Sequence, residues 1–133
     1  RPPRPELTRT VISLGTRWQS GLHHPVSVYA KQVTQGRLRE LCCKYEILAC
    51  QRHLDDLKRQ GTEGFPWVFD ATRANRIIRW FGQCIQVRGV DAGKPIVPEP
   101  WQVFDLGCTY GWVHKDTGAR RFTHTYNKRA RGN

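Results

Sequence analysis

The basic segment at residues 128–133 has the residue types of an anion-binding loop. Its sequence is KRARGN, and it follows the run RRFTHTY, in which aromatic and polar residues alternate. A strand that leads into a basic, glycine-containing loop is how phosphate-binding loops begin, because backbone N–H groups at the start of a following helix can cradle an anion. If Gly-Lys-Ser or Gly-Lys-Thr followed Asn133, Arg129 would occupy the first glycine position of the pattern G-x-x-x-x-G-K-[ST]. A solvated basic tail is the alternative interpretation of this segment.

A glutamine near the start of the last predicted helix has the chemistry to recognise a base. The amide of Gln102 carries a hydrogen-bond donor and an acceptor, which together suit the edge of adenine. Pro98 and Pro100 precede it and fix extended backbone before the helix, and Trp101 can anchor that helix. The alternative is that Gln102 only caps the backbone at the helix N-terminus.

Cysteine and histidine residues form no complete metal site in the sequence. There are five cysteines and no C-x-x-C pair. Cys50 and His53 lie three residues apart on one predicted helix, which is the spacing of half a zinc site. No second Cys/His pair has such spacing, so we expect no metal and predict reduced, mostly buried thiols. The loop pair of His23 and His24 is predicted to face solvent.

The charge balance of the sequence favours a polyanionic partner. The 133 residues include 22 Lys and Arg against 11 Asp and Glu, and the pI is about 10.0. Nucleic acid is favoured over a membrane, because the sequence has no long apolar segment and no strongly amphipathic basic helix. The same pattern predicts a soluble intracellular protein. A basic surface that binds nothing is the alternative.

Cationic residues close to the C-terminal end of the sequence form the predicted nucleic-acid contact. They are Arg120, Arg121, Lys128, Arg129 and Arg131. Asp116 is the only acidic residue near them in the sequence. We therefore predict weak, sequence-independent DNA binding by phosphate neutralisation, with an affinity that falls steeply as salt is added.

Mainly helical elements are predicted to position these residues. Residues 1–24 form an extended, basic, proline-rich arm, which either contacts a partner or DNA or is a plain terminus. Three helices follow within 25–88. The first spans about 25–36, the second spans 38–60, and the third begins after Asp70, a favourable N-cap residue.

Apolar spacing predicts which faces of these helices are buried. Two stripes on the second helix imply contact with two neighbours. One stripe consists of Cys43, Ile47, Cys50, Leu54 and Leu57, and the other of Leu38, Leu41, Tyr45 and Leu48. On the third helix, the predicted inward residues are Ala74, Ile77, Ile78, Phe81 and Ile85. The outward residues Arg73, Arg76 and Arg79 are predicted to form a solvated face, with contact to phosphates as the alternative.

A second unit is predicted after a linker rich in Gly and Pro at 89–97. Residues 98–133 are expected to form a short helix and a β-hairpin before the basic segment. In that hairpin, strands at 112–113 and 121–126 flank the polar loop 115–118. The predicted fold class is therefore mainly α, with a three-helix subdomain followed by a short helix and a hairpin.

A series of short motifs follows in a distinctive order from about Val26 onward. They are Tyr29-Ala30, the run ACQRHLDDL at 49–57, Phe69-Asp70, Glu99-Pro100-Trp101-Gln102, Gly111-Trp112, and Arg120-Arg121-Phe122 leading to Tyr126 and the basic segment. In this order the chain resembles the N-terminal part of a tailed-phage terminase large subunit, the ATP-driven DNA-packaging motor, over roughly three quarters of its length. The sequence departs from the phosphate-loop pattern at Arg129, which stands where the pattern has glycine.

The resemblance implies roles for several residues. The helical segment 25–88 would form a lid over a nucleotide, and 98–133 would begin a P-loop α/β ATPase core with an incomplete phosphate loop. The nucleotide-binding residues would be Trp101, Gln102, Arg129, Arg131, Gly132 and Asn133. Among these, Gln102 would recognise adenine and Arg131 would sense the γ-phosphate.

The resemblance also implies cofactors, partners and a location. ATP and Mg²⁺ would be cofactors of the full-length protein, and double-stranded DNA, a small terminase subunit and a portal protein its partners, with no membrane involved. The location would be the cytoplasm of an infected or lysogenic bacterial host. These 133 residues alone are expected to hold no cofactor and to lack ATPase activity, because they do not include the phosphate-loop lysine and the metal ligands. A self-contained, non-enzymatic basic module that binds nucleic acid or a partner protein is the alternative function.

Overall fold

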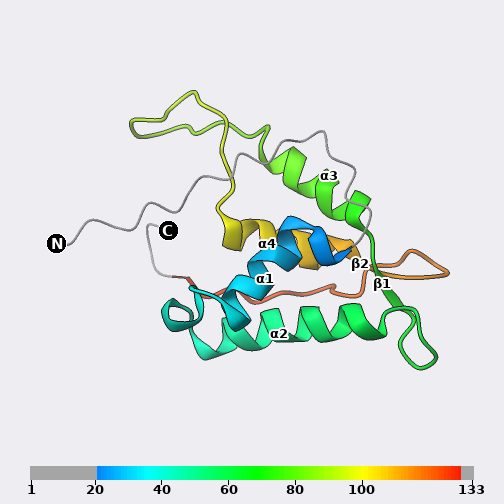
Figure 1. Cartoon of the computed structure of the whole chain (residues 1–133). Helices are drawn as coiled ribbons and strands as arrows, with labels where there is room; N and C mark the ends of the chain where they lie inside the picture. The colour runs from blue at the N-terminus through cyan, green and yellow to red at the C-terminus, as the bar shows by residue number, and fades with distance from the viewer. Residues whose placement is uncertain (1–20, 130–133) are drawn as a thin grey trace.

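A computed structural model describes residues 21–129 of the chain. The elements in chain order are η1 (Gly21–His23), α1 (Pro25–Gln35), η2 (Arg39–Leu41), α2 (Lys44–Arg59), β1 (Trp67–Phe69), α3 (Ala71–Phe81), α4 (Pro100–Gly111) and β2 (Trp112–His114). The predicted mainly α class is confirmed, with four α-helices and a small antiparallel sheet in this part of the chain. Helix α1 packs against α2 and α4, and α4 packs in turn against α3 (Figure 1).

The first helix has the predicted bounds, and its N-terminus shows why. Pro25 occupies the first turn, where a missing N–H costs nothing, and Gly36 follows the last residue. The prediction that His24 faces solvent is wrong, because its side chain is completely buried. Its Nδ1 accepts a hydrogen bond from the N–H of Val26, and its ring meets Phe69 edge-on at 5.3 Å. His24 is therefore the N-cap of α1 and part of the interior.

The second helix is shorter than the predicted 38–60, and one of its two predicted stripes is wrong. The 3₁₀ turn η2 and extended backbone at Cys43 precede α2, which begins only at Lys44. The residues predicted as a second buried stripe are largely in solvent, with Leu41 76%, Tyr45 80% and Leu48 52% exposed. Within the other stripe, the buried residues are Cys50, Leu54 and Leu57. Helix α2 is therefore buried along one face.

Residues 65–69 are more than the aromatic connector expected before the third helix. Three of them form strand β1, which pairs in antiparallel register with β2, so that Trp67 lies opposite His114. The next residue, Asp70, is the predicted N-cap of α3, and its carboxylate accepts the N–H groups of Thr72 and Arg73. Helix α3 ends at Phe81, which leaves Ile85 outside the helix and 58% exposed rather than buried.

Helix α4 approaches α1 closely at a glycine. A Cβ atom placed on Gly107 would lie 2.3 Å from Cγ2 of Val26, a fully buried side chain of α1. Only glycine allows the two helices to come this close. One hydrophobic cluster includes Val26, Ile78, Val103 and Trp112, and thus joins residues from both sides of the predicted linker at 89–97.

The predicted hairpin strand at 121–126 does not form. Strand β2 instead pairs with β1, and residues 115–118 form a turn with Gly118 at φ 67°. On its other edge, β2 meets the returning chain only briefly, through a single bridge between Val113 and Arg120. The chain then follows the helices rather than another strand, and it runs alongside α2 in Figure 1.

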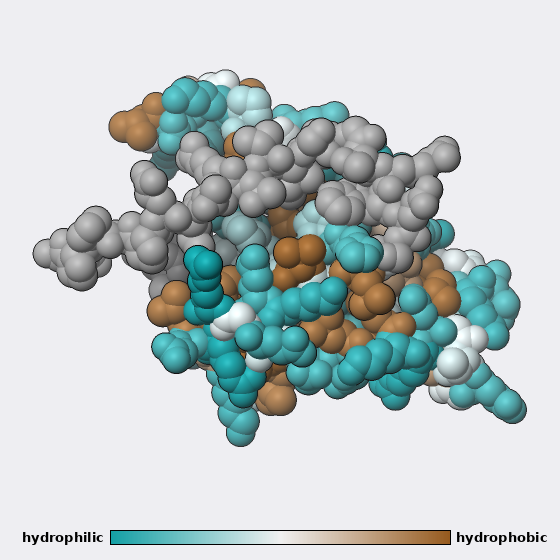
Figure 2. Space-filling view, viewed as in Figure 1, coloured by the Kyte–Doolittle hydropathy of each residue, from teal (hydrophilic) through white to brown (hydrophobic). Residues whose placement is uncertain are grey.

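The loop between α3 and α4 extends away from the helices (Figure 1). Its backbone hydrogen bonds pair Gln86 with Lys94 and with Gly93 across a turn. Val87 is 84% and Val90 98% exposed, and hydrophobic residues stand out at this end of the molecule in Figure 2. In the part of the chain that the structure describes, no helix is both long and apolar enough to span a membrane.

Candidate functional site

Arg129 anchors the start of the basic segment to two helices. Its Nη1 lies 3.2 Å from Oε2 of Glu46 on α2, and its Nη2 lies 3.3 Å from Oδ2 of Asp105 on α4. The guanidinium also lies 4.4 Å from the ring centroid of Trp101, a favourable cation–π distance. Burial raises the pKa of Asp105, and the charge of Arg129 opposes that shift. The basic segment therefore starts beside the N-terminal half of α4.

Gln102 lies in that same half of α4 and takes part in a capping box. Its Oε1 accepts the backbone N–H of Glu99 at 2.8 Å, while the Glu99 side chain accepts the backbone N–H of Gln102. This reciprocal pair satisfies N–H groups that have no partner within the helix. The amide nitrogen of Gln102 forms no hydrogen bond with any residue in 21–129. The structure therefore gives the amide oxygen a helix-capping role and leaves the donor available.

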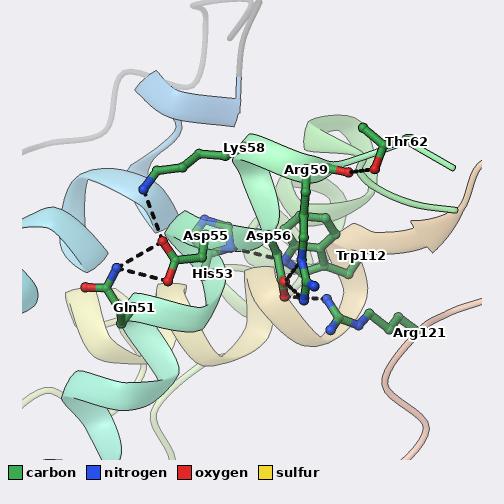
Figure 3. A network of polar contacts seen from close by, with 9 residues as sticks. All are labelled: Gln51, His53, Asp55, Asp56, Lys58, Arg59, Thr62, Trp112 and Arg121. Atoms are coloured by element: carbon green, nitrogen blue, oxygen red, sulfur yellow. Dashed lines mark hydrogen bonds and ion pairs between the residues drawn. The ribbon is translucent and has the colours of Figure 1, made fainter. Parts of the chain in front are cut away.

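Arg121 is held inside the protein by a buried carboxylate (Figure 3). Asp56 on α2 has a side chain only 2% exposed, and it receives Arg121 Nη1 at 2.5 Å and Arg59 Nη2 at 2.6 Å. The guanidinium of Arg121 also lies 4.9 Å from the ring centroid of Phe65. Two cations around one buried anion supply the compensation that burial of a charge requires.

The predicted DNA-contacting residues therefore differ in whether an acidic side chain of the protein already pairs with them. Arg121 and Arg129 both form ion pairs within the chain, and their acidic partners lie on α2 and α4 rather than near Asp116 in the sequence. Lys128 is exposed, and Arg120 lies over the ring of Tyr110 at 5.0 Å. Of these four predicted contacts, only Arg120 and Lys128 have no acidic partner among residues 21–129, so their charges are available to a phosphate.

A second cationic surface, which the sequence did not single out, lies between α3 and the C-terminal end of α4. It is a depression of about 560 Å³ lined by Arg73, Arg76, Ile77, Trp80, Tyr110 and Arg120, and we call it the α3–α4 patch. The three outward arginines of α3 were predicted to form a solvated face, with contact to phosphates as the alternative, and two of them line the patch. The signal that could have found the patch is the helical spacing of Arg73, Arg76 and Trp80, which places an aromatic side chain on the arginine face.

His53 lies in the core and is not placed to act as a base toward Ser27. The indole N–H of Trp112 donates to its Nδ1 at 3.1 Å, and because an indole can only donate, Nδ1 carries no proton. The proton is therefore on Nε2, 2.8 Å from Oγ of Ser27, whose hydroxyl donates to the carbonyl of Gly21. This tautomer cannot take a proton from Ser27. Burial lowers the pKa of His53 to about 4, so the ring is neutral at pH 7.

Comparison with known proteins finds no match: no family model, no curated protein and no solved structure is similar to this chain. The functional interpretation therefore depends on the geometry of these side chains. Among residues 21–129, no group of three or more His, Cys, Asp and Glu side chains is placed to hold a metal ion.

The structure describes only some of the residues that were predicted to bind a nucleotide. Arg131, Gly132 and Asn133 lie outside the described residues, as does most of the arm predicted at 1–24. Trp101, Gln102 and Arg129 are described, and the structure brings them together at one end of α4. The carbonyl oxygen of Gln102 has a second lone pair beyond the one used by Glu99, so the amide can still serve a base as donor and acceptor. The predicted roles of these three residues toward a nucleotide are taken up below as a proposal.

Proposed function

We propose that this chain is the N-terminal portion of an ATP-driven DNA-packaging motor of the terminase large-subunit type. Helices α1 to α3 act as a lid, and α4 carries the amide that selects adenine. The observation that supports this most is the contact of Arg129 with Trp101, at 4.4 Å. A nucleotide site requires the base-selecting residue and the phosphate-binding segment to be near one another, and the contact between Arg129 and the neighbour of Gln102 supports that arrangement.

The proposed division of labour follows from the chemistry of each side chain. Gln102 presents a free amide nitrogen beside an oxygen that the capping box holds in position. Trp101 offers an aromatic surface next to it, one face of which meets Arg129. The segment after Arg129 would bind phosphates, with Arg131 near the γ-phosphate, and Mg²⁺ would be held by residues beyond these 133. Bound Mg²⁺ supplies neutralisation of the charge that develops on the phosphates.

The polar contacts of Arg129 suggest how the lid and the phosphate segment are linked. Glu46 belongs to α2, Asp105 belongs to α4, and both pair with this one guanidinium. A movement of the basic segment would therefore act on a lid helix and on the adenine-side helix together. In the proposed motor, this ion-pair bridge transmits nucleotide occupancy to the helical lid.

The first test of the proposal is the encoded sequence that follows Asn133. The proposal requires Gly-Lys and then Ser or Thr, because this lysine and hydroxyl bind the phosphates and Mg²⁺. A protein that includes this sequence and the ATPase core should hydrolyse ATP, and removal of the lysine should abolish hydrolysis. A stop codon after Asn133 would contradict the proposal.

The alternative function, a self-contained basic module, is favoured by a different observation. Residues from α1, α2, α3, α4 and both strands share one hydrophobic cluster, so a common core lies within residues 21–129. Such a module would bind nucleic acid or a partner protein without catalysis. The encoded sequence after Asn133 distinguishes the two functions.

A further inference from the structure

The α3–α4 patch lies away from the proposed nucleotide site. Trp101 and Tyr110 lie near opposite ends of α4, about 13 Å apart along its axis at the α-helical rise. Arg129 and Gln102 are near the first of these residues, and Arg120 is near the second. A ligand of the patch would therefore be separate from a nucleotide beside Gln102.

Two of the three arginines of this patch have no acidic partner in the described part of the chain. No carboxylate among residues 21–129 forms an ion pair with Arg76 or Arg120. Arg73 is held in place at the edge of the patch, where it donates to the carbonyl of Gly118 at 2.7 Å and pairs with Asp70 at 3.6 Å. Arg73 is thus held at the edge of the patch, and the charges of Arg76 and Arg120 are available to an anion.

Aromatic side chains lie among these cations. Trp80 is 59% exposed, and within the described residues its indole has neither a hydrogen-bond partner nor an aromatic neighbour. Tyr110 is 37% exposed and lies under the guanidinium of Arg120, at 5.0 Å from it. A large indole left in solvent beside arginines is unusual for a surface that binds nothing, because Trp is normally well buried.

Together these features specify the chemistry of a ligand. Guanidinium groups neutralise phosphates, and aromatic faces stack on bases, so alternation of the two is the arrangement that binds single strands. We propose that the α3–α4 patch binds single-stranded nucleic acid, with a base stacked on Trp80 and phosphates at Arg76 and Arg120. In a duplex the base faces are already stacked on one another, so duplex DNA would contact the arginines but would have no base to stack on Trp80. The inference rests on this patch and not on the proposed motor function.

The test is a titration of the 133-residue chain into a fluorescein-labelled oligothymidine of about 12 nucleotides, followed by fluorescence anisotropy. Trp80→Ala is expected to weaken binding roughly 5- to 150-fold, the range found for loss of one base–aromatic stack. Trp80→Phe should recover much of this affinity, because it restores an aromatic face. Arg76→Ala should weaken binding and should also lower the slope of log affinity against log salt by about 0.7, the value for one phosphate contact on a single strand.

Matched controls separate the patch from the general positive charge of the chain. Arg37→Ala removes one exposed arginine outside the patch, and Tyr45→Ala removes an exposed aromatic residue of α2. Both should leave the affinity within about twofold of the wild type. The proposal is overturned if Trp80→Ala binds the oligothymidine as tightly as Tyr45→Ala does. It is also overturned if Trp80→Ala weakens the binding of a duplex of equal length as much as it weakens the binding of the single strand. Neither outcome bears on ATP hydrolysis by an extended protein, so the two proposals can fail separately.

Discussion

Arg121 reaches a carboxylate that lies 65 residues earlier in the chain, with its Nη1 2.5 Å from Oδ2 of Asp56. The side chain of Asp56 is 2% exposed and that of Arg121 is 17% exposed, so the pair is largely removed from water. Arg129 makes a similar connection to Glu46 on the same helix. Two arginines of the C-terminal segment therefore attach it to α2 by ion pairs. Charges that the sequence analysis assigned to DNA binding instead stabilise the fold.

The pair of Arg121 and Asp56 should contribute to stability. Among the described residues, Arg121→Ala leaves the buried carboxylate with Arg59 as its one remaining cation, and we expect it to lower the free energy of unfolding by about 2 to 4 kcal/mol. The neighbouring Arg120→Ala is the matched control, because Arg120 has no acidic partner in the described structure, and it should change stability by less than about 0.5 kcal/mol. Urea unfolding followed by circular dichroism measures both. Equal effects of the two substitutions would mean that the buried pair adds nothing.

Stability should fall as the pH is lowered, because His53 is buried in its neutral form. Its folded-state pKa is about 4, below the unfolded value of about 6.5, so the unfolded chain binds the proton more readily. The stabilisation is complete above about pH 6.5 and is lost as the pH falls toward 4, by up to about 3 kcal/mol. Burial also lowers the pKa of His24, which acts in the same direction.

A substitution that cannot titrate isolates this effect. His53→Gln can still accept from Trp112 and donate to Ser27 through its amide. Denaturant unfolding at several pH values from 7.5 to about 4.5 should show a smaller loss of stability in this variant than in the wild type. Parallel curves for the two proteins would show that His53 does not titrate in this window.

The close approach of α4 to α1 predicts a cost for one added methyl group. Gly107→Ala would place its Cβ 2.3 Å from Cγ2 of Val26, and we expect a loss of about 1 to 3 kcal/mol from overpacking. Gly82→Ala is the control, since its added methyl group meets nothing closer than 3.5 Å. In a double-mutant cycle, the variant that carries both Gly107→Ala and Val26→Ala should lose less stability than the sum of the losses in the two single variants. Strict additivity would contradict the contact.

Local signals in the sequence predicted the helices better than they predicted the pairings. Pro25 and Gly36 mark the ends of α1, and Asp70 marks the start of α3, because each acts on its own neighbours. Strand β2 has its partner far upstream in β1, so the adjacent aromatic run at 121–126 was a misleading candidate. The alternation in that run is compatible with a strand. The residues that it would pair with beyond Arg121 precede Trp112, however, and they belong to helix α4.

The candidate site shows the same division between local and distant information. Proline spacing placed Gln102 correctly at the start of α4, and the capping box that was its alternative role is present. The acidic partners of Arg121 and Arg129 lie on α2 and α4, and only the folded chain brings them close. Likewise, the spacing along α3 indicates only one side of the α3–α4 patch, because Tyr110 and Arg120 join it from α4 and from the segment after β2.

The 133-residue chain should not hydrolyse ATP by itself. The phosphate-loop lysine and the Mg²⁺ ligands that phosphoryl transfer requires are not among these residues. Phosphate release measured with the purified chain should equal the buffer blank. Release that co-purifies with the folded chain and changes on substitution of Arg129 would contradict this expectation.

The central claim is that the amide of Gln102 selects adenine, and substitution to glutamate separates this role from helix capping. Gln102→Glu keeps an oxygen acceptor for the N–H of Glu99, and glutamate is favoured at this position of a capping box, but it has no N–H donor. Gln102→Ala loses both functions. The thermal stability of the glutamate variant should therefore match that of the wild type, whereas the alanine variant should be less stable.

The most direct measurement is the ratio of kcat/KM for ATP to that for GTP in the full-length motor that the proposal requires. Both Gln102→Glu and Gln102→Ala should raise the KM for ATP and should reduce this discrimination by a factor equivalent to about 1 to 3 kcal/mol, because a hydrogen-bonding group of the base is left unpaired. If Gln102→Glu instead keeps wild-type ATP kinetics and base selectivity, Gln102 serves only the capping box with Glu99, and the proposed adenine site is wrong.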